Sequence, residues 1–217
     1  MHPYPKEYMN RIMRLACIGI TLLGVAAGGN AQELLTFDDL ATVSPAPGVP
    51  SQGVIPDGYG GLDWLNFGVV DGRDVDPTYG YYTGVVSSPN VAFNEFSSPA
   101  SIGISSGLFD LNSAYLTAGL NDATPLDVQV QGYVGTTMLY NNTYTVNNSG
   151  PTLINFDYIG VSTVTFISSP VERSATPFAM DNLTVTVPES SSLAMMLLGA
   201  GLSGFIMKLR KPHDKMV

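Results

Sequence analysis

Alternation of apolar and polar residues is the main signal in the middle of the chain. It is clearest over residues 126–133, where Leu, Val, Val and Gly alternate with Asp, Gln, Gln and Tyr. A period of two predicts a strand with one face in a core and the other face in water. Stretches rich in Val, Ile, Thr, Tyr and Phe predict further strands at residues 33–37, 80–87, 101–105, 114–118, 136–146, 152–156, 162–167 and 178–187. Turn residues separate these stretches, so we expect an all-β fold, a jelly-roll-like β-sandwich, over residues 32–187.

Residues 42–62 break this pattern. They are rich in proline and glycine, and proline cannot donate a hydrogen bond to a strand ladder. We therefore expect a long loop, which either carries function or covers part of the sandwich as a flap.

The first 31 residues have the pattern of a secretory signal peptide. Lys6, Arg11 and Arg14 precede an apolar stretch at residues 15–28, and small residues follow. This order predicts a signal helix over residues 1–31 that is cleaved between Ala31 and Gln32. The alternative is an uncleaved membrane anchor, although the apolar run is short for a span, which needs about 20 residues.

A second apolar run of 15 residues lies near the C-terminus, at residues 193–207. The basic residues Lys208, Arg210 and Lys211 follow it, and by the positive-inside rule they favour a cytoplasmic end. The segment is therefore expected to enter the inner membrane transiently and to leave the domain outside.

At these residues the chain resembles the PEP-CTERM sorting signal of Gram-negative bacteria. Val187, Pro188 and Glu189 open the motif, although Ser190 stands where that pattern has a second proline, and a tail at 212–217 follows. The resemblance covers residues 188–211. It implies recognition by an exosortase, removal of the hydrophobic sorting helix and delivery to the cell surface or extracellular matrix. A permanent C-terminal anchor is the alternative.

Charge restricts the possible partners. Residues 32–187 contain fifteen acidic residues and two arginines, a net charge of −13, with no lysine, histidine or cysteine. Such a surface repels nucleic acid and suits cations, neutral sugars or solubility alone. The missing residue types also exclude a Ser-His-Asp triad, a thiolate nucleophile, a Schiff base and a His-ligated zinc. A carboxylate pair is the one catalytic route left. Nothing in the sequence picks out two carboxylates that must face each other across a cleft, so we expect no enzyme activity.

Calcium is the cofactor that this composition favours, because hard cations bind carboxylate and carbonyl oxygens. First and last strands of jelly rolls commonly lie side by side, which would bring Asp38 or Asp39 near Asp181. The aromatic-Asp pair Phe37-Asp38 and the segment Met180-Asp181-Asn182 resemble the ends of carbohydrate-binding-module and MAM-like sandwiches. The resemblance implies a structural calcium between these ends. In the alternative, Asp38 caps a turn and Asp181 accepts backbone hydrogen bonds.

Aromatic residues beside the glycine-rich loops are candidates for stacking on sugars. They are Tyr59, Trp64, Tyr79, Tyr81 and Tyr82. Trp64 has the alternative role of a core side chain.

Taken together, the sequence predicts an exported, non-enzymatic surface or matrix protein that binds carbohydrate or exopolysaccharide. Two alternatives stay open: a structural biofilm-matrix protein without a discrete ligand, and a carboxylate-dependent glycan hydrolase.

Overall fold

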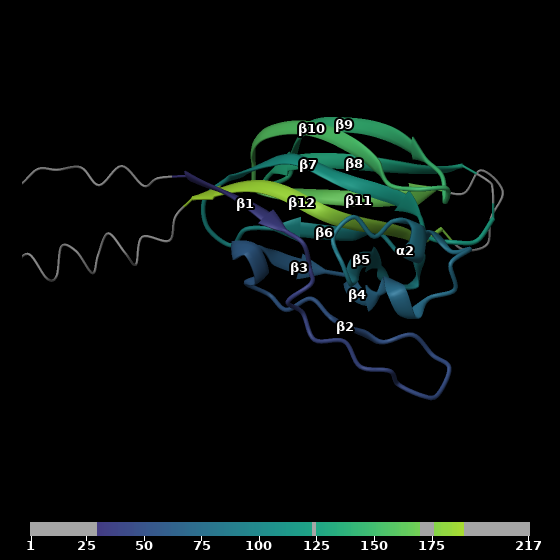
Figure 1. Cartoon of the computed structure of the whole chain (residues 1–217). Helices are drawn as coiled ribbons and strands as arrows, with labels where there is room; N and C mark the ends of the chain where they lie inside the picture. The colour runs from purple at the N-terminus through teal and green to yellow at the C-terminus, as the bar shows by residue number, and fades with distance from the viewer. Residues whose placement is uncertain (1–29, 123–124, 170–175, 189–217) are drawn as a thin grey trace, which may run out of the picture. The chain divides into compact units, whose positions relative to one another are not determined.

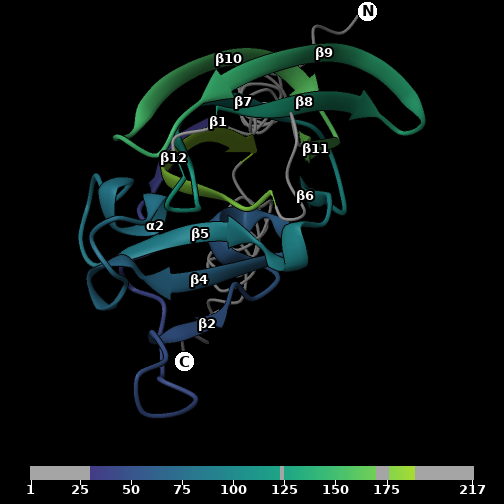
Figure 2. The ribbon, with the colours of Figure 1, turned by 90° about the vertical axis from the view of Figure 1, so that its right-hand side faces the viewer.

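The computed structural model describes residues 30–122, 125–169 and 176–188, which belong to one compact unit, Asn30–Glu189. Twelve strands in these residues form two antiparallel sheets that pack face to face (Figures 1 and 2). The sheet of seven has the order β10-β7-β12-β5-β4-β2, with β1 on β12, and the sheet of five has the order β3-β6-β11-β8-β9. The expected all-β sandwich of two antiparallel sheets is confirmed. The predicted sorting helix and residues 1–29 of the predicted signal helix lie outside the described residues, while residues 30 and 31 belong to a strand.

The strands of the seven-stranded sheet have the following bounds: β1 Asn30–Leu35, β2 Gln52–Val54, β4 Phe67–Asp71, β5 Asn90–Asn94, β7 Phe109–Ala118, β10 Thr152–Val161 and β12 Phe178–Pro188. Those of the five-stranded sheet are β3 Asp63–Leu65, β6 Ala100–Gly103, β8 Leu126–Val134, β9 Thr137–Val146 and β11 Thr163–Ser169. The short helices are η1 Tyr59–Gly61, η2 Gly72–Asp74, α2 Gly80–Thr83 and η3 Glu95–Ser97.

One apolar core fills the space between the sheets. Phe166 of β11 packs edge-on against Phe67 of β4, with ring centroids 5.8 Å apart, and lies 6.0 Å from Phe178 of β12. In β8 the predicted alternation is present, because Leu126, Val128 and Val130 are fully buried while the residues between them are partly exposed. The apolar residues of period two therefore place one face of each sheet in a shared core.

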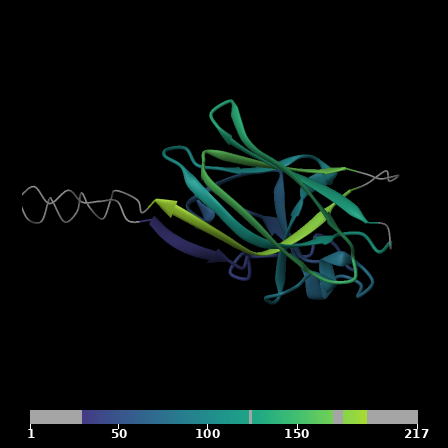
Figure 3. The ribbon, with the colours of Figure 1, turned by 90° about the horizontal axis from the view of Figure 1, so that it is seen from above.

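The first and last strands lie side by side, as expected. β1 pairs antiparallel with β12, with Asn30 opposite Pro188 and Leu35 opposite Leu183 (Figure 3). The predicted signal-cleavage residues Ala31 and Gln32 lie within β1. Val187 and Pro188, which open the predicted sorting motif, lie in β12.

The strand expected at residues 80–87 is wrong. The chain instead forms α2 and a turn, because this segment lies across the outer face of the seven-stranded sheet and does not pair within it. Tyr81 and Val85 pack there against a small second core of Val70, Val91 and Ala179. Gly80 makes the close approach possible, since a Cβ at this position would overlap the carbonyl oxygen of Ala118.

Four strands were not expected from the sequence. β4 and β5 are buried on both faces, so they show a continuous apolar run with no alternation. β2 and β3 have three residues each. β2 and η1 lie within the expected loop at residues 42–62, and an isolated bridge between Val43 and Gln52 closes the proline-rich part.

Candidate functional site

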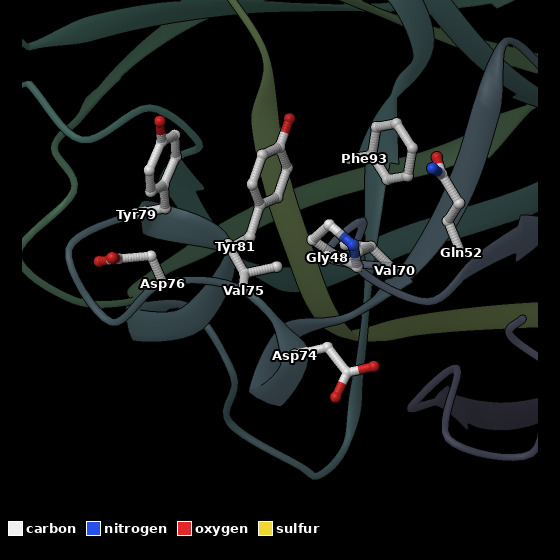
Figure 4. A pocket seen from close by; sticks show the side chains of 10 residues that line it. Gly48, Gln52, Val70, Asp74, Val75, Asp76, Tyr79, Tyr81 and Phe93 are labelled. Atoms are coloured by element: carbon white, nitrogen blue, oxygen red, sulfur yellow. The ribbon is translucent and has the colours of Figure 1, made fainter. Parts of the chain in front are cut away.

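A pocket of about 450 Å³ lies where α2, η2 and the proline-rich loop meet the outer face of the seven-stranded sheet. Its lining residues are Gly48, Pro50, Gln52, Val70, Asp74, Val75, Asp76, Tyr79, Tyr81 and Phe93 (Figure 4). The sheet supplies Gln52, Val70 and Phe93 from three neighbouring strands, β2, β4 and β5. The other residues come from the proline-rich loop, at residues 48–50, and from the segment at residues 74–81, both of which cover this face.

Aromatic rings form one side of the pocket. Tyr81 packs edge-on against Phe93, with ring centroids 5.7 Å apart and an interplanar angle of 77°. Figure 4 shows the rings of Tyr79, Tyr81 and Phe93 across the upper part of the view, with Asp74 and Asp76 below them. Burial raises the pKa of Tyr81, so its hydroxyl group stays protonated and can donate a hydrogen bond.

Two carboxylates bring negative charge to the pocket. Asp74 accepts a hydrogen bond through Oδ2 from the Ser51 hydroxyl at 2.7 Å. Asp76 accepts two bonds through Oδ1 from Thr78, one from the backbone N–H at 2.9 Å and one from the hydroxyl at 2.7 Å. The Thr78 backbone bond, followed by the hydroxyl bond, lowers the pKa of Asp76. The carboxylate of Asp76 is therefore ionised at neutral pH and acts as a hydrogen-bond acceptor.

Tyr82 lies in α2, as Tyr81 does, but its ring contacts an arginine and not the pocket. The guanidinium carbon of Arg73 lies 5.2 Å from the centroid of the Tyr82 ring, which is a cation–π distance. Tyr82 is not among the residues that line the pocket. The cluster expected at Tyr79, Tyr81 and Tyr82 thus divides: two tyrosines line a pocket and the third packs on an arginine.

Trp64 and Tyr59 do not line this pocket: Trp64 lies in β3 of the five-stranded sheet and Tyr59 in η1. The Trp64 side chain is 8% exposed and packs between Phe37 and Phe67, with ring centroids 5.8 and 5.4 Å away. Its indole N–H donates to the Tyr59 carbonyl at 2.9 Å. Trp64 therefore takes the core role. A second hollow beside it, lined in part by Asp57 and Asp63, offers little of the ring to a ligand.

The hydroxyl of Tyr59 fixes the end of β1. It donates to Asp39 Oδ1 at 2.8 Å and accepts from the Phe37 backbone N–H at 3.1 Å. Burial, followed by the hydrogen bond to Asp39, raises the pKa of Tyr59. Phe37 has a positive φ of 65°, and this contact helps to hold a conformation that is uncommon for a bulky residue. Asp39 and Tyr59 thus stabilise the backbone conformation that follows β1.

Asp181 is fully buried in β12 and accepts four hydrogen bonds. The backbone N–H groups of Val86 and Ser87 donate to Oδ2 at 2.7 and 2.9 Å, while the Ser87 hydroxyl donates to Oδ1 at 3.0 Å. The N–H of Asn182 donates to Oδ1 at 2.7 Å. Desolvation nevertheless raises the pKa of Asp181 to about 6. The residue ties the segment at residues 80–87, which covers the outer face of the seven-stranded sheet, to β12.

Asp38 has a comparable role at the start of β5. Its Oδ1 accepts from the Asn90 backbone N–H at 3.0 Å, while Asn90 Nδ2 donates to the carbonyls of Phe37 and Leu40 at 2.8 and 3.0 Å. The Ser87 hydroxyl lies 3.5 Å from the Thr36 carbonyl, which connects this group to Asp181. We call this region, with Asp38, Ser87, Asn90, Asp181 and Asn182, the strand junction.

Two oxygens of the strand junction bear on the calcium prediction. Asn90 Oδ1 and Asn182 Oδ1 are buried side-chain atoms without a hydrogen-bond partner. Amide and carboxylate oxygens are calcium ligands, so the residue types fit a hard cation. In the parts of the chain that the structure describes, no cluster of three or more Asp, Glu, His or Cys side chains is found. Calcium stays a prediction, with Asn90 and Asn182 as additional oxygen donors.

The sequence did not single out Gln52, Val70, Phe93, Asp74 or Asp76 as ligand-binding residues. Asp74 and Asp76 are part of an acidic turn at residues 71–76, and their spacing alone shows no difference between a solvated turn and a pocket wall. Phe93 lies in a strand without alternation. The signal that could have found Asp74 and Asp76 is the aromatic cluster of Tyr79 and Tyr81, three to seven residues further along the chain.

The segments that the sequence predicts to enter the membrane fall outside the described parts of the chain. Residues 1–29 and 189–217 lie outside the described parts of the chain, and with them Glu189, Lys208, Arg210, Lys211 and the apolar run at 193–207. Over residues 30–122, 125–169 and 176–188, no helix has the length and apolar character needed to cross a bilayer.

No protein-family model and no curated protein matches the sequence. Among solved structures, the chain is similar to the CBM22-1–CBM22-2 tandem domain of Paenibacillus barcinonensis Xyn10C, at 10% identity and a TM-score of 0.42, over 76% of this chain and 48% of that one. The chain thus spans about half the length of that structure. It is also similar to the CBM22-1 xylan-binding domain of the same protein, at 11% identity and a TM-score of 0.39, over 75% of this chain and 99% of that one.

A third similar structure is TmCBM61 in complex with β-1,4-galactotriose, at 10% identity and a TM-score of 0.30, over 60% of this chain and 93% of that one.

Proposed function

We propose that this protein is a non-enzymatic carbohydrate-binding protein whose site is the pocket beside Tyr79 and Tyr81. The observation that carries the proposal is the composition of this pocket: aromatic rings on one side, with Asp74, Asp76 and Gln52 as polar groups. Sugars present C–H patches that stack on aromatic faces and hydroxyl groups that donate to carboxylates. A volume of about 450 Å³ is within the range of small-molecule sites.

Charge sets the class of sugar. The pocket lining holds two aspartates and no basic residue. A uronic acid or a sulfated sugar would bring a second negative charge beside these carboxylates, at an energetic cost. Neutral sugars and protonated amino sugars carry no such cost. We therefore expect binding to neutral and amino-sugar polysaccharides and weaker binding to acidic ones.

Binding is favoured over hydrolysis by the hydrogen bonds of Asp76. A carboxylate-dependent glycan hydrolase needs a general acid whose pKa is raised so that it holds a proton. The pKa of Asp76 is lowered by its hydrogen bonds to Thr78, which makes it a poor proton donor. Since both carboxylates can accept hydrogen bonds from a ligand, their role as binding groups fits the geometry better.

The test is a binding panel with purified full-length protein. Neutral, amino-sugar and acidic polysaccharides are each titrated, and release of reducing ends is followed in the same samples. We expect saturable binding to the first two groups and no new reducing ends. Absence of binding across the panel would contradict the carbohydrate proposal and favour a structural matrix protein, whereas new reducing ends would favour the hydrolase.

We also propose that the protein is exported and processed at both ends. Support comes from the signal-peptide pattern, from the resemblance at residues 188–211 to a PEP-CTERM signal, and from the pairing of Gln32 with Thr186. Both predicted signals would join the domain at one end of the same strand pair. In mass spectra of a surface fraction from the native cells, we expect a chain that begins near Gln32. Recovery of a chain that runs from Met1 to Val217 would overturn both assignments.

A further inference from the structure

Strand β9 is an edge of the five-stranded sheet and lacks most of the devices that protect edges. An exposed edge strand offers unpaired backbone N–H and C=O groups, and proteins usually protect it with charge, proline, bulges or short length. β9 runs for ten residues, Thr137–Val146, and contains neither charge nor proline. Its pairing with β8 shows one register shift, near its start. Within the described residues no strand pairs with its other side.

The other edges are protected. β2 and β3 have three residues each, and β1 has six and carries Glu33. β10 lies near β9 at the same side of the molecule (Figure 2), but its pairing with β7 is interrupted twice. Asp157 within it has a φ of 52° and Gly160 a φ of 68°, which turns the backbone away from a regular ladder. Among these edges, β9 alone is long, regular and uncharged.

The charge pattern indicates what could pair with β9. Residues 32–187 carry a net charge of −13, so two copies repel each other over most of their surfaces. Residues 128–156, which include all of β9, contain no charged residue. Two copies can therefore meet at β9 without placing like charges opposite each other, which destabilises strand pairs.

The sequence of β9 is also close to symmetric about Asn142. It reads Tyr140-Asn141-Asn142-Thr143-Tyr144. In an antiparallel pair of two identical strands centred on Asn142, each Tyr140 faces a Tyr144, each Asn141 faces a Thr143, and the two Asn142 residues face each other. A two-fold interface of this kind uses the same surface on both copies, and facing aromatic residues stabilise strand pairs.

These side chains are already held in place within one copy. Tyr140 stacks on Tyr158, with ring centroids 4.4 Å apart and an interplanar angle of 8°. Tyr144 packs edge-on against Phe156 at 5.4 Å. Asn142 Nδ2 donates to the Tyr158 hydroxyl at 3.0 Å. Because the strand is fixed before it pairs, little conformational entropy is lost on association.

We propose that β9 pairs edge to edge with β9 of a second copy of this chain, antiparallel and centred on Asn142, so that the two five-stranded sheets form one continuous sheet. This interface is separate from the pocket and does not depend on carbohydrate binding. The unpaired backbone groups of β9 supply the hydrogen bonds, and the absence of charged residues in β9 permits the approach.

Cysteine cross-linking tests both the contact and its register. In full-length protein carrying Cys17→Ser, we compare Asn142→Cys with Thr145→Cys after mild oxidation. Two copies of residue 142 would face each other, whereas two copies of residue 145 would be six residues apart along the pair, about 20 Å. We expect covalent dimers of the Asn142→Cys variant and none of the Thr145→Cys variant. Equal cross-linking of both variants, or of neither, would overturn the proposal.

A charged variant gives an independent measurement. Asn142→Lys places like charges at the centre of the pair, while the matched control Ser105→Lys adds the same charge to an exposed loop. By sedimentation, with circular dichroism to establish an intact fold, we expect Asn142→Lys to shift the protein to monomer and Ser105→Lys to leave the dimer unchanged. A dimer that persists in both variants would contradict pairing through β9.

Discussion

Single aromatic residues of this chain have different roles although their sequence surroundings look alike. Tyr59, Trp64, Tyr79, Tyr81 and Tyr82 all lie beside glycine-rich turns. Trp64 is buried between Phe37 and Phe67, while Tyr79 and Tyr81 line a pocket. The difference depends on contacts between residues that are distant in the chain, such as the packing of Tyr81 on Phe93, which a local pattern does not show.

Asp181 gives a prediction at the residue scale. Desolvation raises its pKa from 3.8 to about 6 in the folded protein. A raised pKa means that the folded state binds the proton more tightly than the unfolded state. The contribution of Asp181 to the free energy of unfolding is therefore fully present below about pH 4 and is lost as the pH rises through about 6, by about 3 kcal/mol at most.

Asp181→Asn removes this titration. Chemical unfolding at several pH values between 4 and 7 should show a steeper loss of stability for the wild type than for Asp181→Asn. A wild type that gains stability over this range relative to the variant would show that the four hydrogen bonds, or a bound cation, keep the carboxylate charged.

At the scale of elements, alternation and β-propensity together predicted most of the long strands. β8, which alternation predicted, and β9, β11 and β12, which their β-branched and aromatic residues predicted, lie where the sequence placed them, within a few residues. β4 and β5 were not expected because the covering segment buries their second face and removes the alternation. The same segment, residues 80–87, was wrongly assigned as a strand since its apolar residues face the sheet from outside.

The strand junction gives a prediction at the element scale. If calcium binds the oxygens of Asp38, Asn90, Asp181 and Asn182, a chelator should lower the melting temperature of the wild type and leave that of Asp181→Ala unchanged. The physical reason is that a ligand of the folded state stabilises it, and removal of the ligand removes this contribution. Wild-type melting curves that coincide with and without chelator would rule out calcium at the junction.

At the scale of the whole molecule, the sandwich holds its pocket and its unprotected edge on different elements. The pocket uses the outer face of β2, β4 and β5, and the edge belongs to β9 in the other sheet. A protein with this arrangement could bind sugar and pair with a second copy at the same time. The fold class followed from strand patterns and turn residues, whereas the pocket depends on how two irregular segments fold over a sheet.

The most direct test of carbohydrate binding compares two tyrosines of one short helix region. Tyr79 lines the pocket, whereas Tyr82 packs on Arg73 outside it. With a neutral polysaccharide that binds the wild type, Tyr79→Ala should weaken binding about tenfold or more, since an aromatic contact contributes on the order of 1 kcal/mol beyond its buried area. Tyr82→Ala should bind as the wild type does. Equal affinity of both variants and the wild type would contradict the pocket as the sugar site.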